Sequence, residues 1–428
     1  MGTGHRTTDV AIIGGGPSGV AAGIPLARAG LRVTIFEKDK FPRFCIGESL
    51  LPHGNDALRE LGVWDKLENA GYLRKYGADF CSGDGSRTHR FWFKQSLGRE
   101  REYSFQVDRA SFDRLLLDHA AEQGCEVLEQ TRVTGLKDPN TEDMRLTYSG
   151  LEGEGSIGAR WVIDASGRSA FAGARIGFRR SQTLPSRRVA IYGHFEGVER
   201  NTGKAAGHIA IVRLREAWFW FIPLADGRTS VGVVVPTAMV NAQAASGSRQ
   251  KLEVVFRKVV EESSEAQRRL ARARAVAPLV ATGDYSWRFS SFAASRILLT
   301  GDAAGFLDPV FSSGVTLAFK SGLRAAGALL KAEAGGRALS PSEQAGYTRE
   351  MACWMRHYSK IIRLFYTTGG FEVFMSPAPL LGIPKSIGRL VGGETTLGIA
   401  DRLRLWVFRC LCRLQEMIRI VPVIRSLR

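Results

Sequence analysis

The sequence predicts an α/β protein with a doubly wound, three-layer domain, a second domain built on an antiparallel sheet, and a helical C-terminal region. Three observations predict this fold class. Residues 9–37 read as strand, glycine turn, helix and strand. Four apolar runs separated by turns lie between residues 189 and 235. Beyond residue 339, aromatic and aliphatic residues are mixed with arginines in a pattern that favours helices.

The first element is a strand–helix–strand unit. Asp9–Ile13 has the sequence of a short buried strand, Pro17–Ala29 is a helix of small residues, and Leu31–Glu37 predicts a second strand. Such a unit is right-handed and begins a doubly wound sheet. The N-terminal fold is therefore of the nucleotide-binding, Rossmann-like type.

The turn after the first strand carries the pattern GxGxxG at residues 14–19. Gly14 permits the tight turn, Gly16 lets backbone amides approach a pyrophosphate, and Gly19 lets helix and strand pack closely. Glu37 ends the second strand, where its carboxylate would accept hydrogen bonds from a ribose. The pattern predicts dinucleotide binding, with a purely structural glycine turn as the alternative. FAD and NAD share this fingerprint.

Both sheets are predicted from the middle of the chain. Residues 78–106 are β-like and turn-rich, Ser111–Gln123 has apolar residues at helical spacing, and strands resume at Glu126. After a loop rich in Arg and Ser at residues 181–188, four successive strands favour an antiparallel sheet: Val189–Phe195, His208–Leu214, Trp218–Pro223 and Thr229–Val235.

Near residue 296 the chain returns to the first domain. Arg296–Leu299 predicts a short buried strand, and a helix begins near Ser312 and continues toward Ala334. We therefore expect a discontinuous nucleotide-binding domain (residues 1–80, 101–185 and 276–335), an antiparallel-sheet substrate domain (81–100 and 186–275) and a helical region (336–428).

Composition and charge narrow the function classes. The 428 residues are 44% hydrophobic and 24% charged, which is typical of a globular protein and argues against a disordered or disulfide-stapled chain. The net charge of +17 predicts an acidic partner, such as nucleic acid, anionic lipid or an acidic protein. Nucleic acid is disfavoured, because the basic residues are dispersed through folded segments without a recognised binding module.

The sequence predicts neither a membrane span nor a metal site. Apolar stretches such as Val231–Val235 are far shorter than the ~20 residues of a spanning helix, and the first nine residues do not resemble a secretory signal. The six cysteines and seven histidines have no metal-ligand spacing. We expect a cytoplasmic protein that binds no metal.

A second nucleotide signal lies far downstream. Gly301–Gly305 (GDAAG) follows the strand Arg296–Leu299 and precedes a helix, which suits a carboxylate that hydrogen-bonds a ribityl chain. The alternative is that Asp302 is a simple helix N-cap.

Four segments together carry a family resemblance: Gly47–Pro52, Asp108–Asp113, Asp164–Gly167 and Gly301–Gly305. They resemble the single-component-fold flavoprotein monooxygenases and their relatives, over roughly residues 8–375. The resemblance implies FAD as the cofactor, bound by Gly14, Gly16, Ser18, Gly19, Glu37, Glu48, Ser49, Arg109, Val133, Asp302 and Gly314.

One branch of that superfamily matches two further features. Trp218–Pro223 reads WFWFIP, which is the WxWxIP signature of flavin-dependent halogenases, and Lys75 occupies the place of their essential lysine. The resemblance implies that Trp218 and Trp220 line the wall between flavin and an aromatic pocket, and that Lys75 is catalytic. The alternatives are two core tryptophans of a sheet and a surface lysine.

The segment Asp308–Val315 is similar to the family's loop at the flavin edge. The resemblance implies that backbone amides at Ser313 and Gly314 bind the halide, since a helix N-terminus attracts anions, and a plain helix cap is compatible with that role. Tryptophan halogenases have a glutamate where this chain has Phe311, which we place in the pocket. The chain therefore looks more like the halogenases of phenols and pyrroles.

The family's chemistry implies further components. A separate flavin reductase would supply reduced FAD, oxygen and chloride or bromide would yield hypohalous acid, and Lys75 would deliver the halogen to an electron-rich ring. Many members of this branch act on a substrate tethered to an acidic acyl or peptidyl carrier protein, and the charge of +17 is consistent with such a partner. Lys75 would act either as a neutral amine that forms a haloamine or as a hydrogen-bond donor to hypohalous acid.

Two questions stay open at this point. The alternative enzyme is an FAD-dependent aromatic monooxygenase or a prenyl-type reductase of the same fold, and a flavoprotein that only docks a carrier protein is a third possibility.

Residues 401–428 hold seven arginines and an apolar face with Leu403, Trp406, Val407 and Leu411. We expect this helix to pack on its own protein, with membrane or partner docking as the alternative.

Overall fold

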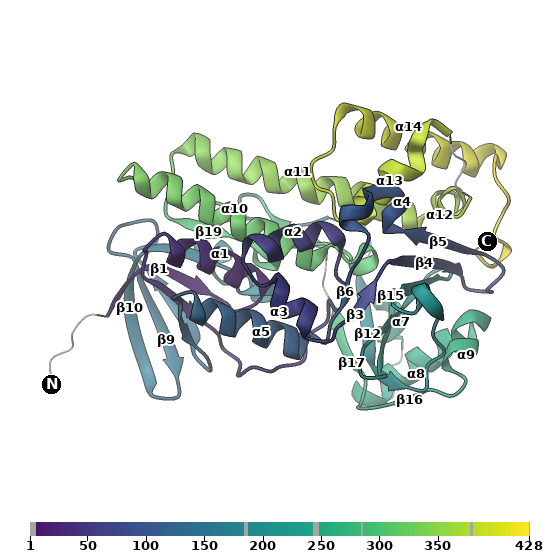
Figure 1. Ribbon diagram of the computed structural model, residues 1–428, viewed down its shortest axis with the longest axis horizontal. Helices are drawn as coiled ribbons and strands as arrows, with labels where there is room; N and C mark the ends of the chain where they lie inside the picture. Colours follow the sequence, from purple (N-terminus) through teal and green to yellow (C-terminus); the bar gives the residue numbers. More distant parts are fainter. Residues whose placement is uncertain (1–5, 184–186, 243–247, 284–285, 377–379, 428) are drawn as a thin grey trace.

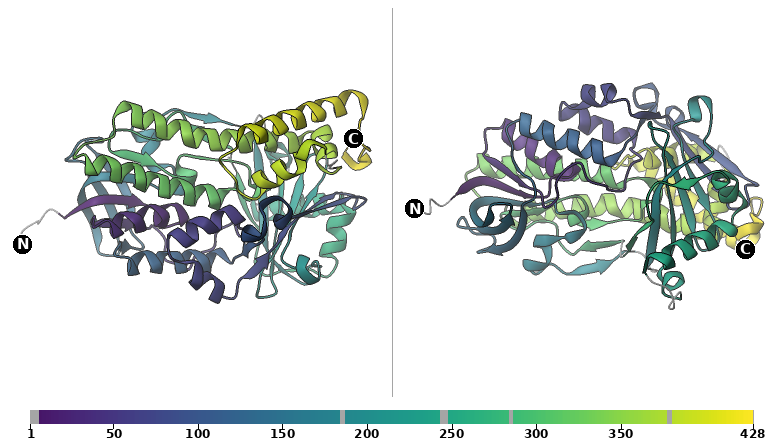
Figure 2. Two further views of the ribbon diagram at one scale, coloured as in Figure 1. Left: turned by 45° about the horizontal axis from the view of Figure 1, so that its top comes forward. Right: turned by 90° about the horizontal axis from the view of Figure 1, so that it is seen from below.

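The computed structural model describes the chain except residues 1–5, 184–186, 243–247, 284–285, 377–379 and 428. Part of the segment assessed as a secretory signal and part of the Arg- and Ser-rich loop at 181–188 lie outside the described residues. Two sheets lie toward opposite ends of an elongated molecule, and the long helices α10 (Gly314–Ala334) and α11 (Pro341–Tyr366) run along one side of it (Figures 1 and 2).

The first sheet has the doubly wound core that the sequence predicts. Strands β7 (Glu126–Leu128), β2 (Val33–Phe36), β1 (Thr7–Ile13), β10 (Gly153–Asp164) and β19 (Ile297–Leu299) lie side by side and pair in parallel. Beside β10 the sheet continues in an antiparallel direction through β9 (Arg145–Gly150) and β8 (Arg132–Lys137). The predicted return of the chain near residue 296 is confirmed by the pairing of β19 with β10.

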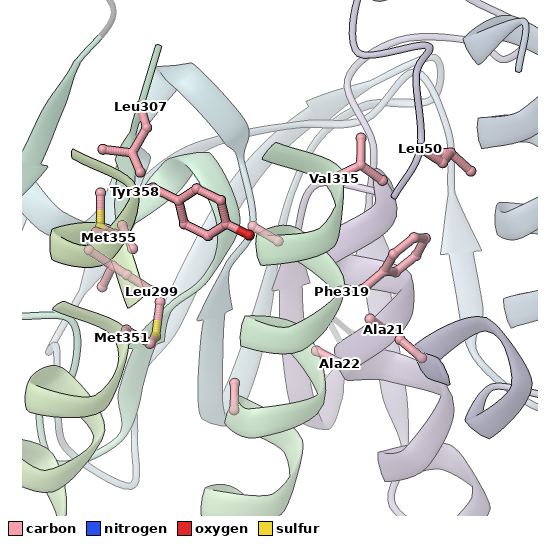
Figure 3. Close-up of a cluster of buried hydrophobic side chains, with 14 of the residues drawn as sticks. Ala21, Ala22, Leu50, Leu299, Leu307, Val315, Phe319, Met351, Met355 and Tyr358 are labelled. Carbon is pink, nitrogen blue, oxygen red and sulfur yellow. The ribbon is translucent and has the colours of Figure 1, made fainter. Parts of the chain in front are cut away.

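Small residues bring two helices close together over this sheet. Helix α1 (Pro17–Arg28) packs against α10, and α10 lies between α1 and α11 (Figure 3). A methyl group on Gly322 of α10 would lie 2.4 Å from the carbonyl oxygen of Ser18 on α1. Because that contact is with backbone, only glycine permits this approach. Helix α5 (Arg109–Glu122) begins two residues before the predicted start, since the carboxylate of Asp108 caps it by accepting the Ala110 N–H at 2.8 Å.

The second sheet contains the four strands predicted between residues 189 and 235. They are β12 (Arg188–Glu196), β13 (Ile209–Arg213), β14 (Trp218–Pro223) and β15 (Thr229–Pro236), and they pair antiparallel in the order β12-β15-β14-β13. Strand β4 (Gly77–Ser82) joins β13 in parallel and pairs antiparallel with β5 (Thr88–Trp92). Both β4, which crosses the expected boundary at residue 80, and β17 (Val280–Gly283) belong to this sheet. The division of the chain into domains stays a prediction.

Alternation along β14 gives the second sheet two different faces. Phe219 and Phe221 pack into a separate apolar cluster with α8 (Ser248–Glu261), whereas Trp218, Trp220 and Ile222 belong to the main core. Successive side chains of a strand point to opposite faces. The two tryptophans therefore face the main core.

The C-terminal region is helical, as predicted. It contains α11, α12 (Thr368–Phe374), α13 (Ile383–Val391) and α14 (Ile399–Ile418). None of the helices in the described part of the chain is both long and apolar enough to cross a membrane.

The last helix packs on its own protein, as expected, but not through the whole apolar face named from the sequence. Val407 and Leu411 are half-buried, but Leu403 and Trp406 are exposed by 60% and 57%. Helix α14 packs instead through Phe408 and Cys412, which lie on its other side.

Candidate flavin and halide site

A cavity of about 550 Å³ lies between the carboxyl ends of the parallel strands, α10, α11 and the inner face of the second sheet. Most of the residues proposed from the sequence line it: Gly14, Gly16, Ser18, Glu37, Glu48, Ser49, Arg109, Val133, Trp218, Trp220, Asp302, Ser313 and Gly314. Gly19, Lys75 and Phe311 are not among the lining residues. The carboxyl edge of a doubly wound sheet is where such folds bind their ligands.

The three glycines of the first turn have separate roles. Gly14 has φ +109°, and a methyl group there would lie 2.4 Å from the carbonyl oxygen of Ala165. A methyl group on Gly19 would lie 1.9 Å from the carbonyl oxygen of Gly14, whereas one on Gly16 would approach nothing closer than 3.9 Å. Gly14 and Gly19 thus permit the turn and the packing, and Gly16 faces open space where a ligand can approach.

The N-terminus of α1 suits a pyrophosphate. Its first residues receive no side-chain cap, and Pro17 at the first helical position has no N–H to satisfy. Ser18 lines the cavity, and its buried hydroxyl has no hydrogen-bond partner among the described residues. Free amides at a helix N-terminus and an unpartnered hydroxyl fit an anionic group in the cavity.

Glu37 is held in place by two backbone amides. Its Oε2 accepts the Gly15 N–H and its Oε1 accepts the Asp39 N–H, both at 2.9 Å. A carboxylate has about four acceptor positions, so two remain for ribose hydroxyls. This geometry fits the role that the sequence predicts for Glu37.

Arg109 fixes the segment that carries Glu48. It donates to Asp113 at 2.7 and 2.9 Å and to the carbonyl oxygen of Ile46 at 2.6 Å. Burial alone would lower the pKa of Arg109, but pairing with Asp113 raises it above its usual value. Gly47 has φ +100°, and a methyl group there would lie 2.7 Å from the Arg109 guanidinium.

Asp302 lies in a short 3₁₀ turn, Gly301–Ala303, whose capping residue is Thr300. The alternative that Asp302 is a helix N-cap is therefore wrong. Burial raises the pKa of the Asp302 carboxyl to about 6, and Arg109 and Arg168 partly oppose that rise. Together with the glycine turn and Glu37, this carboxylate fits FAD in the cavity: the turn would hold the pyrophosphate, and Glu37 and Asp302 would hold hydroxyl groups.

The N-terminus of α10 forms the other side of the cavity. Ser312 has φ +55°, and Ser313 caps the 21-residue helix without a side-chain hydrogen bond. Unsatisfied N–H groups at the start of a long helix favour an anion. Phe311 lies in an aromatic cluster with Phe80 and Phe365, at centroid distances of 6.1 and 5.9 Å, and its place in the aromatic pocket stays a prediction. Its neighbours Pro309 and Ser312 both line the cavity, whereas the Phe311 side chain turns away from it.

Trp218 and Trp220 line the cavity with their ring centroids 5.9 Å apart. The Trp220 indole N–H donates to the Ser230 hydroxyl at 3.2 Å, and the Trp218 indole N–H donates to the Tyr366 hydroxyl at 2.8 Å. Both rings are therefore fixed by hydrogen bonds as well as by packing.

Tyr366 was not predicted from the sequence. Its hydroxyl donates to Asp308 Oδ2 at 2.6 Å, and Asp308 Oδ1 accepts the Val310 N–H at 3.1 Å. Burial raises the pKa of Asp308 to about 6, although the hydrogen bond from Tyr366 opposes that shift. The chain from Trp218 through Tyr366 to Asp308 connects the second sheet to the turn before Ser313.

Lys75 ends β3 (Leu73–Lys75), which pairs with β6 (Ser104–Gln106). Its side chain is only 1% exposed, its Nζ donates to the carbonyl oxygen of Leu50 at 3.0 Å, and it lies 5.3 Å from the ring centroid of Phe93. Burial lowers the pKa of Lys75 to about 7. The alternative of a surface lysine is therefore wrong. Leu50 directly follows the cavity residue Ser49, so the amine lies behind the cavity wall.

A histidine that sequence analysis passed over also reaches the site. His194 Nε2 lies 2.5 Å from Glu48 Oε1, and Arg228 contacts the other ring nitrogen at 3.1 Å. Glu48 is 1% exposed, so this contact supplies a partner to a buried carboxyl group. No motif links residues 146 positions apart, and only the folded structure reveals the contact.

The sequence of this chain is similar to an FAD-binding domain model and to named halogenases. A model of the FAD binding domain matches residues 7–350. Flavin-dependent halogenase armH2 of Armillaria mellea is 35% identical over 338 residues, which span 75% of this chain and 65% of armH2. The 1H-pyrrole-2-carbonyl-(peptidyl-carrier protein) chlorinase of Pseudomonas fluorescens is 31% identical over 76% of each chain.

The fold is also similar to that of solved flavin-dependent halogenases. The flavin-dependent brominase Bmp2 superposes with a TM-score of 0.83 at 26% identity, covering 96% of this chain and all of that one. The chain is an FAD-binding flavoprotein. It belongs to the family of flavin-dependent halogenases.

Proposed function

We propose that this protein uses reduced FAD, oxygen and chloride or bromide to halogenate an electron-rich phenol or pyrrole ring, with Lys75 as the catalytic residue. The observation that carries the proposal is the position of Lys75: a fully buried amine directly behind the wall of a cavity that fits FAD. Lysine is rarely buried without an acidic partner, so the burial of Lys75 indicates a functional role.

FAD, reduced by a separate flavin reductase, would activate molecular oxygen, which supplies the oxidising equivalent that turns halide into hypohalous acid. The residues of the chain have distinct tasks. The amides of Ser313 and Gly314 hold the halide, and Trp218 and Trp220 form a rigid wall that keeps the ring away from the flavin. Their fixed indoles support this role, because a mobile wall would let substrate reach the oxidant.

The low pKa of Lys75 favours a haloamine. A pKa of about 7 leaves much of the amine neutral at neutral pH, with a lone pair free to attack the halogen of hypohalous acid. The nitrogen–halogen bond forms as the halogen–oxygen bond breaks, and the amine proton leaves with the hydroxide as water. The ring carbon then takes the halogen, loses its proton, and restores the N–H.

A carrier protein is the proposed bearer of the ring. Support comes from the Pseudomonas fluorescens chlorinase, whose name states a carrier-bound pyrrole, and from the net charge of +17, which favours an acidic partner. An aromatic monooxygenase would insert oxygen instead, and a prenyl-type reductase would saturate a double bond. Halide dependence separates these activities from the proposed one.

Intact-mass analysis of a loaded carrier protein tests the proposal. The carrier, bearing a pyrrolyl or a phenolic acyl group, is incubated with the enzyme, FAD, a flavin reductase, NADH and chloride. A mass gain of one chlorine in place of hydrogen is the expected result, and bromide in place of chloride should give the corresponding bromine shift. Hydroxylated product, or halogenation that persists with Lys75→Met, would contradict the proposal.

A further inference from the structure

One face of the small ribbon around β6 carries Lys75 together with other polar side chains. Lys75 lies opposite Ser104 in the β3–β6 pair, and Ser49 lies opposite Gln106 on the other edge of β6. Directly opposed residues share a face, and so do residues two apart on a strand. Lys75, Ser104, Gln106 and Ser49 therefore project from the same face.

The orientation of the Gln106 amide is fixed by its partner. Its Nε2 donates to the carbonyl oxygen of Gly207 at 2.9 Å. The amide oxygen has no hydrogen to donate to a carbonyl, so the contact identifies which end of the carboxamide is nitrogen and which is oxygen. Gln106 is fully buried, and its Oε1 has no hydrogen-bond partner among the described residues. A buried acceptor without a hydrogen bond is unfavourable, so Gln106 Oε1 is free to accept one from a bound group.

A second unpartnered group lies beside it. Ser49 is 3% exposed and lines the cavity, and its buried hydroxyl has no partner among the described residues. On the other side of Gln106, Gly207 lies two residues before Ile209, which also lines the cavity. The Gln106 carboxamide thus lies between two segments that border the FAD cavity.

The spacing matches an aromatic ring. Residues two apart on a strand are about 6.7 Å apart, so Gln106 lies about one ring width along β6 from the position opposite Lys75. The geometry points to Gln106 Oε1, assisted by the Ser49 hydroxyl, as the acceptor for the ring N–H or O–H of the aromatic substrate. This inference rests on the proposed function and deepens it, because it names the substrate group that is recognised.

Such an acceptor has a chemical consequence as well as a binding one. A hydrogen bond from the ring N–H or O–H increases electron density on the ring carbons, which are the nucleophile. It also orients the ring between the acceptor and Lys75. Rings without a donor, such as furans, would leave Oε1 unpaired and would be rejected.

The test compares two probes that differ only in this donor. Pyrrole-2-carbonyl-pantetheine carries the ring N–H, and furan-2-carbonyl-pantetheine has an oxygen of similar size in its place. Affinities for the full-length, FAD-loaded protein are measured by tryptophan fluorescence. We expect the pyrrole probe to bind roughly tenfold or more tightly than the furan probe. In Gln106→Leu this ratio should fall below about 2, because neither ring then meets an acceptor.

Ser104→Ala is the matched control. Ser104 lies on the same strand and face, but its hydroxyl already donates to Asn55 at 2.8 Å, so its removal should leave the ratio unchanged. Gln106→Met provides a second apolar variant if Gln106→Leu does not fold. The ratio of affinities, rather than either affinity, is compared, so a general loss of stability cancels.

Two results would overturn the inference: equal affinities of the wild-type protein for the two probes, or a ratio that survives in both apolar variants. Either result would mean that the amide oxygen of Gln106 does not accept a hydrogen bond from the substrate ring. The measurement needs no turnover. Failure to halogenate any ring would therefore contradict the proposed function. The role of Gln106 would still be tested separately, by the ratio of the two affinities.

Discussion

The Trp218 indole N–H donates a 2.8 Å hydrogen bond to the Tyr366 hydroxyl, which joins the inner face of the second sheet to the end of α11. The same hydroxyl donates to Asp308 at 2.6 Å. Since both partners are buried, neither can turn to water if the hydroxyl is removed. The position of the cavity wall thus depends on a residue that does not line the cavity.

We expect Tyr366→Phe to destabilise the protein by about 1–3 kcal/mol, because it leaves one buried donor and one buried carboxyl without their partner. The pKa of Asp308 should rise further, since the hydrogen bond from Tyr366 now lowers it. Urea unfolding gives the stability change, and the quantum yield of tryptophan fluorescence reports the freed indole.

Tyr358→Phe is the control for this variant. Tyr358 lies on the same helix and is fully buried, but its hydroxyl has no partner among the described residues. Its removal should be neutral or stabilising. Equal losses in the two variants would show that the hydroxyl of Tyr366 has no special role.

Gly47→Ala should weaken FAD binding by about tenfold or more, through both backbone strain and the 2.7 Å approach to Arg109. Gly71→Ala is the matched control, because its φ of +74° carries the same kind of strain while nothing lies within 4 Å of the added methyl. Titration with FAD, followed by flavin fluorescence, separates the two. If both variants bind FAD equally, the contact with Arg109 does not position the Gly47–Glu48 segment.

The parts of the site that the sequence could predict are those built within one short segment. The roles of Gly14, Gly16 and Glu37 follow from a strand, a turn and a helix whose geometry is local. The alternation along β14 likewise gives Trp218 and Trp220 one face, because a strand has a period of two. In these places local pattern and final fold agree.

Contacts across the fold could not be predicted. Tyr366 reaches Trp218 over 148 positions and His194 reaches Glu48 over 146, and no spacing rule connects such residues. The aromatic cluster of Phe311 is another such contact, because its partners Phe80 and Phe365 belong to β4 and α11. The exposed Leu403 and Trp406 show that an apolar pattern does not identify which side of a helix is covered.

Lys75→Met should stabilise the protein while abolishing halogenation. The unfolded lysine holds its proton up to its usual pKa of 10.5, and the folded one only up to about 7. Burial therefore costs stability at pH 7 and below, and the cost shrinks as pH rises toward 10.5. The gain in Lys75→Met should be on the order of a few kcal/mol at pH 7 and should decrease by pH 9. Denaturant unfolding at the two pH values measures it, and FAD titration checks that the cofactor site is intact.

The pH dependence of halogenation distinguishes the two roles left open for Lys75. If the neutral amine takes up the halogen, product formation with saturating carrier should rise through a midpoint near pH 7, where the folded amine loses its proton. If the ammonium only donates a hydrogen bond, the rate should fall over the same range. Trapping of free hypohalous acid with a small chlorinatable dione, in the absence of carrier, corrects for any pH effect on the flavin step. A rate that decreases as pH rises through 7, after this correction, would rule out the haloamine and retain the lysine as a donor.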